Sequence, residues 1–226
     1  MSLHAAVLIV AASFGLQIMV AVPAAAQDAE TLKIVTLGTS LTAKGGWQGA
    51  LRRSLGACRN KTVSVVNLAR SGMTSEWGVT QVEKVLAERP DIVLVEFAVN
   101  DAALTRFVSF RRSSANMVEI ISGLLAGKTS PAVYVMAMNP VSGLRGMIRP
   151  WLDDYVALHA AIARKLGAGF IDHRPAWARL SPEEIDRAIP DGTHPDPEVA
   201  SRVMVPVLVH ALAGGNCSAA KTERGY

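Results

Sequence analysis

Three polar residues have types and spacings that permit nucleophilic chemistry. Asp191 precedes His194 by three positions in the Gly- and Pro-rich stretch 190–195 (PDGTHP). That spacing lets a carboxylate accept a hydrogen bond from the imidazole, which fixes the tautomer and leaves the other ring nitrogen free as a base. Ser40 follows an apolar run, in 38–42 (GTSLT), and its hydroxyl would be the nucleophile. Taken alone, these signals also fit a solvated loop and a helix N-cap serine.

Two further residues could stabilise negative charge. Gly72 follows a second apolar run and would let the main chain approach a ligand and offer its N–H. Asn100 follows a third apolar run, and its side-chain amide could donate to an oxyanion. The alternatives are a turn glycine for the first residue and an Asx-turn for the second.

Apolar, β-branched runs alternate with helical patterns along the chain. Strands are predicted at 33–37, 62–68, 91–97, 132–138 and 169–171. Helices are predicted at 47–55, 76–88, 114–126, 150–166 and 198–212, the fourth with Pro150 in its first turn. Such an order predicts a single doubly wound α/β domain, with helices on both faces of a parallel sheet. Ligands of such sheets bind beyond the carboxyl ends of the strands, where Ser40, Gly72 and Asn100 are placed.

The order Ser40, Gly72, Asn100 and Asp191-x-x-His194 resembles the sequence blocks of the SGNH/GDSL hydrolase family, whose members include secreted bacterial esterases and lipases. The resemblance runs from residue 33 to about residue 212. It implies a flavodoxin-like fold with about five parallel strands and no cofactor. It also implies Ser40 as nucleophile, His194 as general base and Asp191 as its orienting partner. The oxyanion hole would consist of the N–H groups of Ser40 and Gly72 and the side chain of Asn100.

Two positions depart from the family pattern. The family's Gly-Asp-Ser-Leu reads Gly-Thr-Ser-Leu here, with Thr39 in place of the Asp. That Asp is outside the triad, so we expect only a different local hydrogen bond near the nucleophile. Ala98 stands where the third block commonly has Gly, and its methyl group is expected to narrow the floor of the site.

Other residues compete for the same roles. His173, beside Asp172 after the fifth predicted strand, is the main rival base. Glu96 lies inside an apolar strand, where a carboxyl group needs a partner. We interpret it as a structural hydrogen-bonding group, with support of the active-site loops as the alternative. Three serines lack the strand–Gly-x-Ser–helix setting: Ser71, Ser75 and Ser142. Two histidines in helical patterns are interpreted as structural or surface residues: His159 and His210.

The implied activity is hydrolysis of short-acyl esters, for example acetyl esters, through an acyl-enzyme on Ser40, with small molecules or saccharides as substrates. An acyltransferase with the same triad, a lysophospholipase- or thioesterase-type hydrolase and a non-catalytic saccharide-binding protein are the alternatives. Aromatic residues make up only 5% of the chain and no large lid domain is visible, which argues against a long-chain lipase. Arg106 and Phe107 are predicted to border the substrate pocket, although a solvated basic loop fits them equally well.

The first 26 residues differ from the rest of the chain. Residues 5–22 form an almost unbroken apolar run, followed by Pro23 and three alanines. This pattern predicts a secretory signal peptide (1–26) cleaved after about Ala26, and a secreted or periplasmic domain over 27–226. An uncleaved N-terminal membrane anchor is the alternative. After cleavage no membrane span is expected, and the tail after about residue 213 is expected to be flexible.

The remaining composition limits the partners. The net charge is +4 without a Lys/Arg block, which argues against nucleic-acid binding. The two cysteines, Cys58 and Cys217, either form a disulfide or remain thiols. Neither has the spacing of a zinc site, so no metal is predicted. The sequence leaves the oligomeric state open.

Overall fold

A computed structural model describes residues 31–214 and residue 217. Its centre is a five-stranded parallel sheet with strand order β2-β1-β3-β4-β5. The strands are β1 (Leu32–Gly38), β2 (Val63–Asn67), β3 (Ile92–Glu96), β4 (Ala132–Ala137) and β5 (Gly169–Asp172). The predicted doubly wound α/β fold is confirmed, with the strand order of flavodoxin-like proteins.

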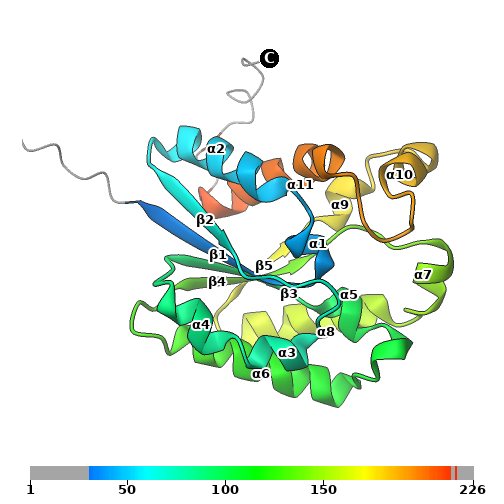
Figure 1. The fold of residues 1–226 in the computed structure, drawn as a ribbon, viewed down its shortest axis with the longest axis horizontal. Coiled ribbons are helices and arrows are strands. Elements are labelled where there is room, and N and C mark those ends of the chain that lie inside the picture. The colour runs from blue at the N-terminus through cyan, green and yellow to red at the C-terminus, as the bar shows by residue number, and fades with distance from the viewer. Residues whose placement is uncertain (1–30, 215–216, 218–226) are drawn as a thin grey trace, which may run out of the picture.

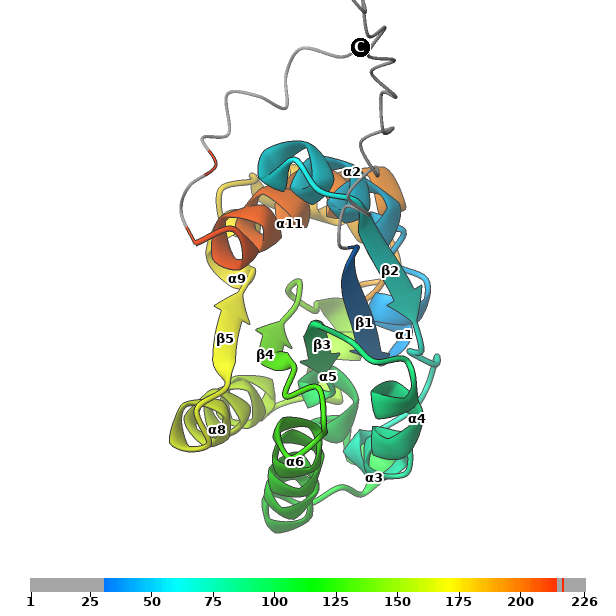
Figure 2. The same ribbon diagram turned by 90° about the vertical axis from the view of Figure 1, so that its left-hand side faces the viewer.

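Helices cover both faces of the sheet (Figures 1 and 2). One face carries α2 (Trp47–Arg59) and α11 (Pro197–Leu212). The other carries α3 (Ser75–Val79), α4 (Val82–Ala87), α6 (Phe110–Leu125) and α8 (Leu152–Lys165). Short helices follow strands or link these elements: α1 (Ser40–Ala43), α5 (Ala98–Asp101), η1 (Leu104–Arg106), α7 (Gly143–Met147), α9 (Arg174–Trp177) and α10 (Pro182–Ala188).

The buried strand residues divide between two apolar layers. In β1, Ile34 packs into the layer under α2 and α11, whereas Val35 and Leu37 pack into the layer of α4 and α6. Side chains of successive strand residues point to opposite faces, so a strand covered on both sides must be apolar throughout. This explains why the strands appear in the sequence as continuous apolar runs.

Several predicted helices differ from the observed ones. α2 extends four residues beyond its predicted end at 55, and α6 begins four residues before its predicted start at 114. The helix expected at 76–88 is divided into α3 and α4, because the Thr80 hydroxyl donates to the Trp77 carbonyl at 2.7 Å and the Thr80 N–H also bonds there. A side chain that competes for a main-chain carbonyl favours a helix end. The helix expected from Pro150 begins at Leu152, with Trp151 as its N-cap. Pro150 therefore precedes the helix instead of occupying its first turn.

The chain reverses its winding direction between β1 and β3, which are adjacent in the sheet. Gly38 at the end of β1 is in register with Glu96 at the end of β3. The residues that follow these two positions therefore emerge side by side at the topological switch point, where open α/β sheets bind ligands.

Cys58 of α2 and Cys217 form a disulfide, with Cα atoms 5.8 Å apart and 159 positions between them in the sequence. A cross-link over so long a loop restricts the unfolded chain and thereby stabilises the fold. Within the described residues, no helix has the length and apolar character needed to cross a membrane. The predicted signal peptide, and the tail beyond residue 214 apart from Cys217, lie outside these residues.

Candidate active site

Ser40, His194 and Asp191 form one continuous chain of hydrogen bonds. Ser40 Oγ lies 2.7 Å from His194 Nε2, and His194 Nδ1 lies 2.6 Å from Asp191 Oδ2. Asp191 Oδ1 accepts a second hydrogen bond from the His194 main-chain N–H at 2.7 Å. With the carboxylate as acceptor, Nδ1 carries the proton and Nε2 is left as the base toward Ser40. The structure thus brings Ser40, near the start of the described chain, into contact with Asp191 and His194, near its end.

The charge of Asp191 is stabilised in this arrangement. Its burial alone would raise its pKa, but hydrogen bonds from the side chain and main chain of His194 and from the Thr193 N–H lower the pKa to about 2. Asp191 is therefore ionised at neutral pH. The side chains of His194 and Asp191 are 40% and 44% exposed, so the site is open to solvent.

The loop that carries His194 is held by the segment after β4. The Ser142 N–H donates to the Gly192 carbonyl at 2.9 Å, and Asn139 Nδ2 donates to the Thr193 carbonyl at 2.8 Å. Gly192 has φ +73°, and a Cβ atom there would lie 2.6 Å from the Ser142 carbonyl oxygen. Only glycine combines this backbone conformation with so close a contact.

Ser40 is the first residue of α1, and the N-cap is Thr39, whose hydroxyl accepts from the Leu41 N–H at 3.3 Å. The interpretation of Ser40 as a helix cap is therefore wrong. Its hydroxyl is free to bond His194. A main-chain N–H in the first turn of a helix has no intrahelical acceptor, so the Ser40 N–H is also available to a ligand.

Glu96 lies directly beneath the turn that carries Ser40. It is 1% exposed and accepts from the Thr39 N–H at 2.6 Å, from the Thr39 hydroxyl at 2.9 Å and from the Thr42 hydroxyl at 2.9 Å. A Cβ atom on Gly38 would collide with Glu96 Oε1, so glycine leaves room for the carboxyl group. The local hydrogen bond expected to differ from the family pattern is thus the Thr39–Glu96 pair.

Burial raises the pKa of Glu96 to about 7, against the lowering effect of its hydrogen bonds from Thr39 and Thr42. Between pH 4.5 and about 7 the folded protein therefore holds a proton that the unfolded chain releases. The free energy of unfolding should fall by roughly 3 kcal/mol as pH rises through this window, and level off above it.

Glu96→Gln should remove this contribution while retaining an acceptor for the Thr39 N–H. The measurement is urea unfolding of wild type and variant at pH 5 and pH 8, with Glu119→Gln, an exposed residue of α6, as a control. The difference between the two proteins isolates Glu96 from every other titrating group. Equal pH dependence in wild type and Glu96→Gln would contradict this assignment.

Gly72 and Asn100 lie together next to the Ser40 turn. Asn100 Nδ2 donates to the Met73 carbonyl at 2.8 Å, which leaves its second amide hydrogen for a ligand. Gly72 adopts φ +79° in the turn before Met73. The Arg70 N–H donates to the Gly38 carbonyl at 3.0 Å, which fixes this turn beside the end of β1. The structure therefore brings the three predicted oxyanion donors to one edge of the sheet.

Three other residues discussed in the sequence analysis lie at different distances from the candidate site. A Cβ atom on Gly72 would lie 3.4 Å from Arg106 Nη2, so Arg106 borders the site. Phe107 is 92% exposed, and its ring extends into solvent. Ala98 is buried at the start of α5, where it packs with Ala102 and Tyr155.

The rival base His173 is unsuited to the role. It is fully buried, neither ring nitrogen has a hydrogen-bond partner among the described residues, and burial lowers its pKa to about 4. The competing serines are also placed differently from Ser40. Ser75 is fully buried as the first residue of α3, and Ser142 is exposed before α7.

The fold contains a second, internal Ser–His–Asp group that the sequence did not predict. Ser113 Oγ lies 2.6 Å from Asp101 Oδ2 and 2.7 Å from His159 Nε2. Because all three side chains are buried and burial lowers the pKa of His159 to about 3, this group is closed to substrate. Asp101 also accepts from the Ser75 N–H at 2.9 Å. The group therefore connects α3, α6 and α8 to the helix that carries Asn100. Asp101 follows the third predicted strand, Ser113 precedes one predicted helix and His159 lies in another, so no spacing in the sequence links them.

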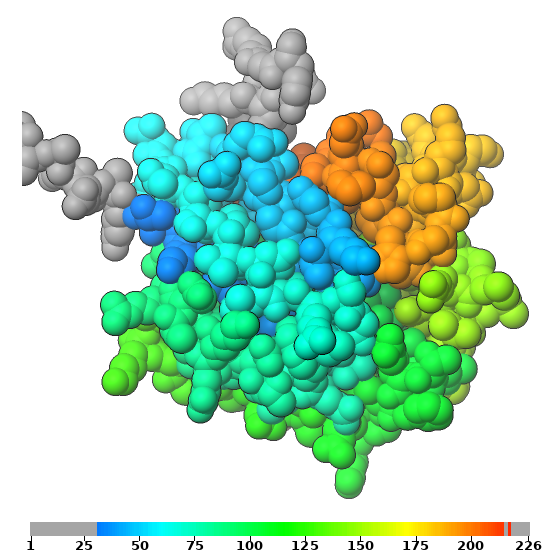
Figure 3. Space-filling view, in the orientation of Figure 1, coloured from blue at the N-terminus to red at the C-terminus, as the bar shows by residue number. Residues whose placement is uncertain are grey.

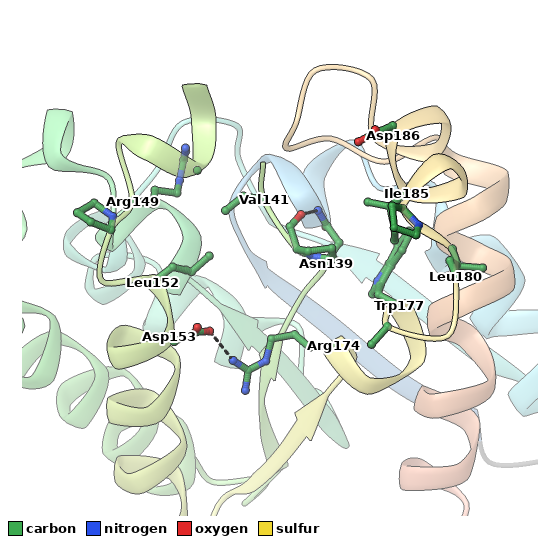
Figure 4. Close-up of a pocket in the computed structure, with 15 residues that line it drawn as sticks. Asn139, Val141, Arg149, Leu152, Asp153, Arg174, Trp177, Leu180, Ile185 and Asp186 are labelled. Carbon is green, nitrogen blue, oxygen red and sulfur yellow. Dashed lines mark hydrogen bonds and ion pairs between the residues drawn. The ribbon is translucent and has the colours of Figure 1, made fainter. Parts of the chain in front are cut away.

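A cavity of about 620 Å³ opens beside the His194 loop. Its wall includes Asn139, which bonds that loop, and Arg174, which pairs with Asp153 at 2.9 Å (Figure 4). Neither Ser40 nor His194 lines it, so the cavity neighbours the Ser–His–Asp chain without containing it. Across residues 31–214, no cluster of three or more His, Cys, Asp or Glu side chains is placed to hold a metal ion.

Comparison with known proteins relates this geometry to a family. The profile of the GDSL-like lipase/acylhydrolase family matches residues 36–201. No curated protein matches the chain. Solved structures with the same fold match at low sequence identity, and three of them serve as examples. A lipase/acylhydrolase from Enterococcus faecalis has a TM-score of 0.70 and 24% identity, covering 80% of this chain and 95% of that one.

An acetylxylan esterase from Geobacillus stearothermophilus has a TM-score of 0.69 and 18% identity, covering 83% of this chain and 96% of that one. An α/β hydrolase from the metagenome of Lake Arreo, Spain, has a TM-score of 0.66 and 19% identity, covering 82% and 96%. The family profile spans most of the chain and the sheet has the fold of these enzymes. The chain therefore belongs to the GDSL-like lipase/acylhydrolase family and is a carboxylic ester hydrolase.

Proposed function

We propose that this esterase hydrolyses short-acyl esters through a covalent acyl-enzyme on Ser40. The observation that carries the proposal is the unbroken hydrogen-bond chain from Ser40 Oγ through His194 to Asp191, at the switch point of the sheet. A serine hydroxyl becomes an effective nucleophile when an oriented base accepts its proton.

The proposed reaction has two steps. His194 Nε2 takes the hydroxyl proton as Ser40 Oγ attacks the ester carbonyl carbon, and the carbonyl oxygen becomes an oxyanion. This oxyanion would accept hydrogen bonds from the N–H groups of Ser40 and Gly72 and from the Asn100 amide. Collapse breaks the ester C–O bond, and His194 returns the proton to the leaving alcohol. Water, activated by His194 in turn, then releases the acid and regenerates Ser40.

We further propose that the alcohol portion of the substrate is a saccharide and the acyl group is short. Among the solved structures with this fold is an acetylxylan esterase. The cavity beside the His194 loop has a volume in the usual range for small-molecule sites. Its wall carries charged groups able to bond sugar hydroxyls, namely Arg174, Asp153 and Asp186.

A chain-length series of p-nitrophenyl esters tests the acyl specificity, with Ser40→Ala as the blank. The proposal expects kcat/KM to be highest for acetate and to fall as the acyl chain lengthens. A maximum at eight carbons or longer would contradict it and favour a lipid ester. Acetylated xylooligosaccharides test the alcohol. If acetyl groups transfer to an added sugar instead of appearing as acetate, the chain is an acyltransferase with the same triad.

Asn100→Ala should lower kcat for p-nitrophenyl acetate by about a hundredfold or more, with a smaller change in KM. The reason is that the amide hydrogen bond would form only with the oxyanion of the transition state. Asn116→Ala is a control for loss of a buried amide, because Asn116 donates to Ser75 instead of facing the site. Similar turnover in Asn100→Ala and wild type would exclude Asn100 from the oxyanion hole.

A further inference from the structure

Large apolar side chains are concentrated at one place on the surface. Among the described residues, seven such side chains are exposed, and six of them belong to segments 104–110 and 144–151. We call these two segments the apolar ridge; its side chains are Leu104, Phe107, Phe110, Leu144, Met147 and Trp151. Phe107, Leu144 and Met147 are 92%, 79% and 72% exposed. Scattered exposed apolar residues need no explanation, but a concentration of this kind marks an interaction site.

The two segments of the ridge are joined in space. The Leu104 N–H donates to the Ile148 carbonyl at 2.9 Å. The Phe110 ring stacks on Tyr155 with centroids 4.3 Å apart, and the Tyr155 N–H bonds the Trp151 carbonyl at 3.1 Å. In Figure 3 the yellow-green atoms around α7 border green atoms of the region that follows α5. The ridge is thus one continuous surface.

The charges on the ridge are positive. Arg106, Arg111 and Arg145 are exposed, and no carboxylate of the described residues lies within ion-pair distance of them. Burial, and then the charges of Arg145 and Arg106, lower the pKa of Arg149, so positive groups from both segments meet here. Arg112 is paired with Glu76 at 3.3 Å. The nearest acidic residues in sequence are Asp101, Asp153 and Asp154. Asp101 is buried, whereas Asp153 and Asp154 lie in the first turn of α8, where Asp153 is paired with Arg174.

We propose that the apolar ridge docks the protein on an anionic lipid bilayer. Exposed Phe, Trp, Leu and Met side chains surrounded by arginines fit the boundary between lipid headgroups and acyl chains. A second copy of the chain fits less well, because a two-fold interface would set the same arginines against each other. The ridge borders the candidate active site through Arg106, beside Gly72, and through Arg149, whose Nε donates to the Val99 carbonyl at 2.6 Å. Docking would therefore bring the site to esters at a membrane surface. This proposal does not depend on which acyl group the enzyme cleaves.

Tryptophan quenching by brominated lipids tests this contact in the full chain. All four tryptophans lie between residues 47 and 177, so the N-terminal apolar segment carries no fluorophore and the quenching reports where the folded domain meets the lipid. Trp47 and Trp177 are fully buried, whereas Trp151 is 49% exposed on the ridge. Vesicles of brominated phosphatidylglycerol should quench the fluorescence, and Trp151→Phe should remove most of that effect. Vesicles of brominated phosphatidylcholine should require at least about tenfold more lipid, and added NaCl should weaken the binding.

The variant Leu144→Ser/Met147→Ser removes two of the most exposed side chains of the ridge. It should raise the lipid concentration for half-maximal quenching by about tenfold or more. Val118→Ser is the matched control, since Val118 is 40% exposed on α6 but lies outside the ridge, and it should bind as wild type does. Hydrolysis of p-nitrophenyl acetate should be unchanged in both variants, which separates docking from the proposed catalysis.

Three results would overturn the proposal. The first is absence of quenching by phosphatidylglycerol vesicles. The second is equal quenching in wild type and Leu144→Ser/Met147→Ser, or by anionic and neutral vesicles. The third is a dimer in sedimentation velocity that this double variant converts to monomer, because the ridge would then be an interface between copies of the chain.

Discussion

Ser40→Ala should lower kcat for p-nitrophenyl acetate by roughly 10⁴- to 10⁶-fold, because the variant has no hydroxyl to form the acyl-enzyme. His194→Ala should cost about as much, and the double variant little more, since nucleophile and base act as one unit. The 2.7 Å contact between Ser40 Oγ and His194 Nε2 is the structural reason to expect this non-additivity.

The measurement is steady-state kinetics of the two single variants and the double variant, with thermal unfolding to establish that each is folded. Ser142→Ala is the matched control, because Ser142 is an exposed serine next to the His194 loop and its N–H, not its hydroxyl, bonds Gly192. If losses from Ser40→Ala and His194→Ala multiplied in the double variant, the two residues would act independently and the proposed mechanism would fail.

Asp191→Asn should lower kcat by about 10⁴-fold while leaving KM and the fold nearly unchanged. The carboxylate accepts from His194 Nδ1 at 2.6 Å, whereas an Asn amide turned toward this nitrogen would donate to it and favour the wrong tautomer. Because the pKa of Asp191 is about 2, its carboxylate is charged throughout the assay range. Titration of Asp191 should therefore contribute nothing to the pH dependence of wild-type activity between about pH 5 and 9.

Glu183→Gln is the control for Asp191→Asn, since Glu183 is an exposed acid on α10. It should retain wild-type turnover. Near-normal activity of Asp191→Asn would show that His194 is oriented by other groups, and the role proposed for Asp191 would be wrong.

The sheet was predictable because its strands are buried on both faces. Five short apolar runs separated by helical patterns are enough to predict parallel pairing, and the observed order places β1 beside β3. The division into α3 and α4 was not predictable from periodicity. It depends on Thr80, whose hydroxyl competes for a helix carbonyl. This hydrogen bond is a local contact that a helical pattern does not contain.

In the candidate site, too, local contacts were predictable from the sequence and long-range contacts were not. Asp191 and His194 share one loop, so their spacing alone predicts a hydrogen bond, which the structure shows at 2.6 Å. The Thr39–Glu96 contact joins residues 57 positions apart, and only the register of β1 with β3 brings them together. The apolar ridge was likewise not predictable from the sequence, because Leu144 and Met147 lie in a short segment without a clear helical or strand periodicity. Its second half meets residues 104–110 only through the tertiary fold.

The most direct test of the central claim is the identity of the residue that forms the covalent intermediate. The full chain is treated with a fluorophosphonate, and the adduct is located by intact mass and by peptide mapping. The proposed mechanism predicts one adduct, on Ser40, with no labelling in Ser40→Ala and much slower labelling in His194→Ala. An adduct on another residue, or an active enzyme that the reagent never modifies, would contradict it.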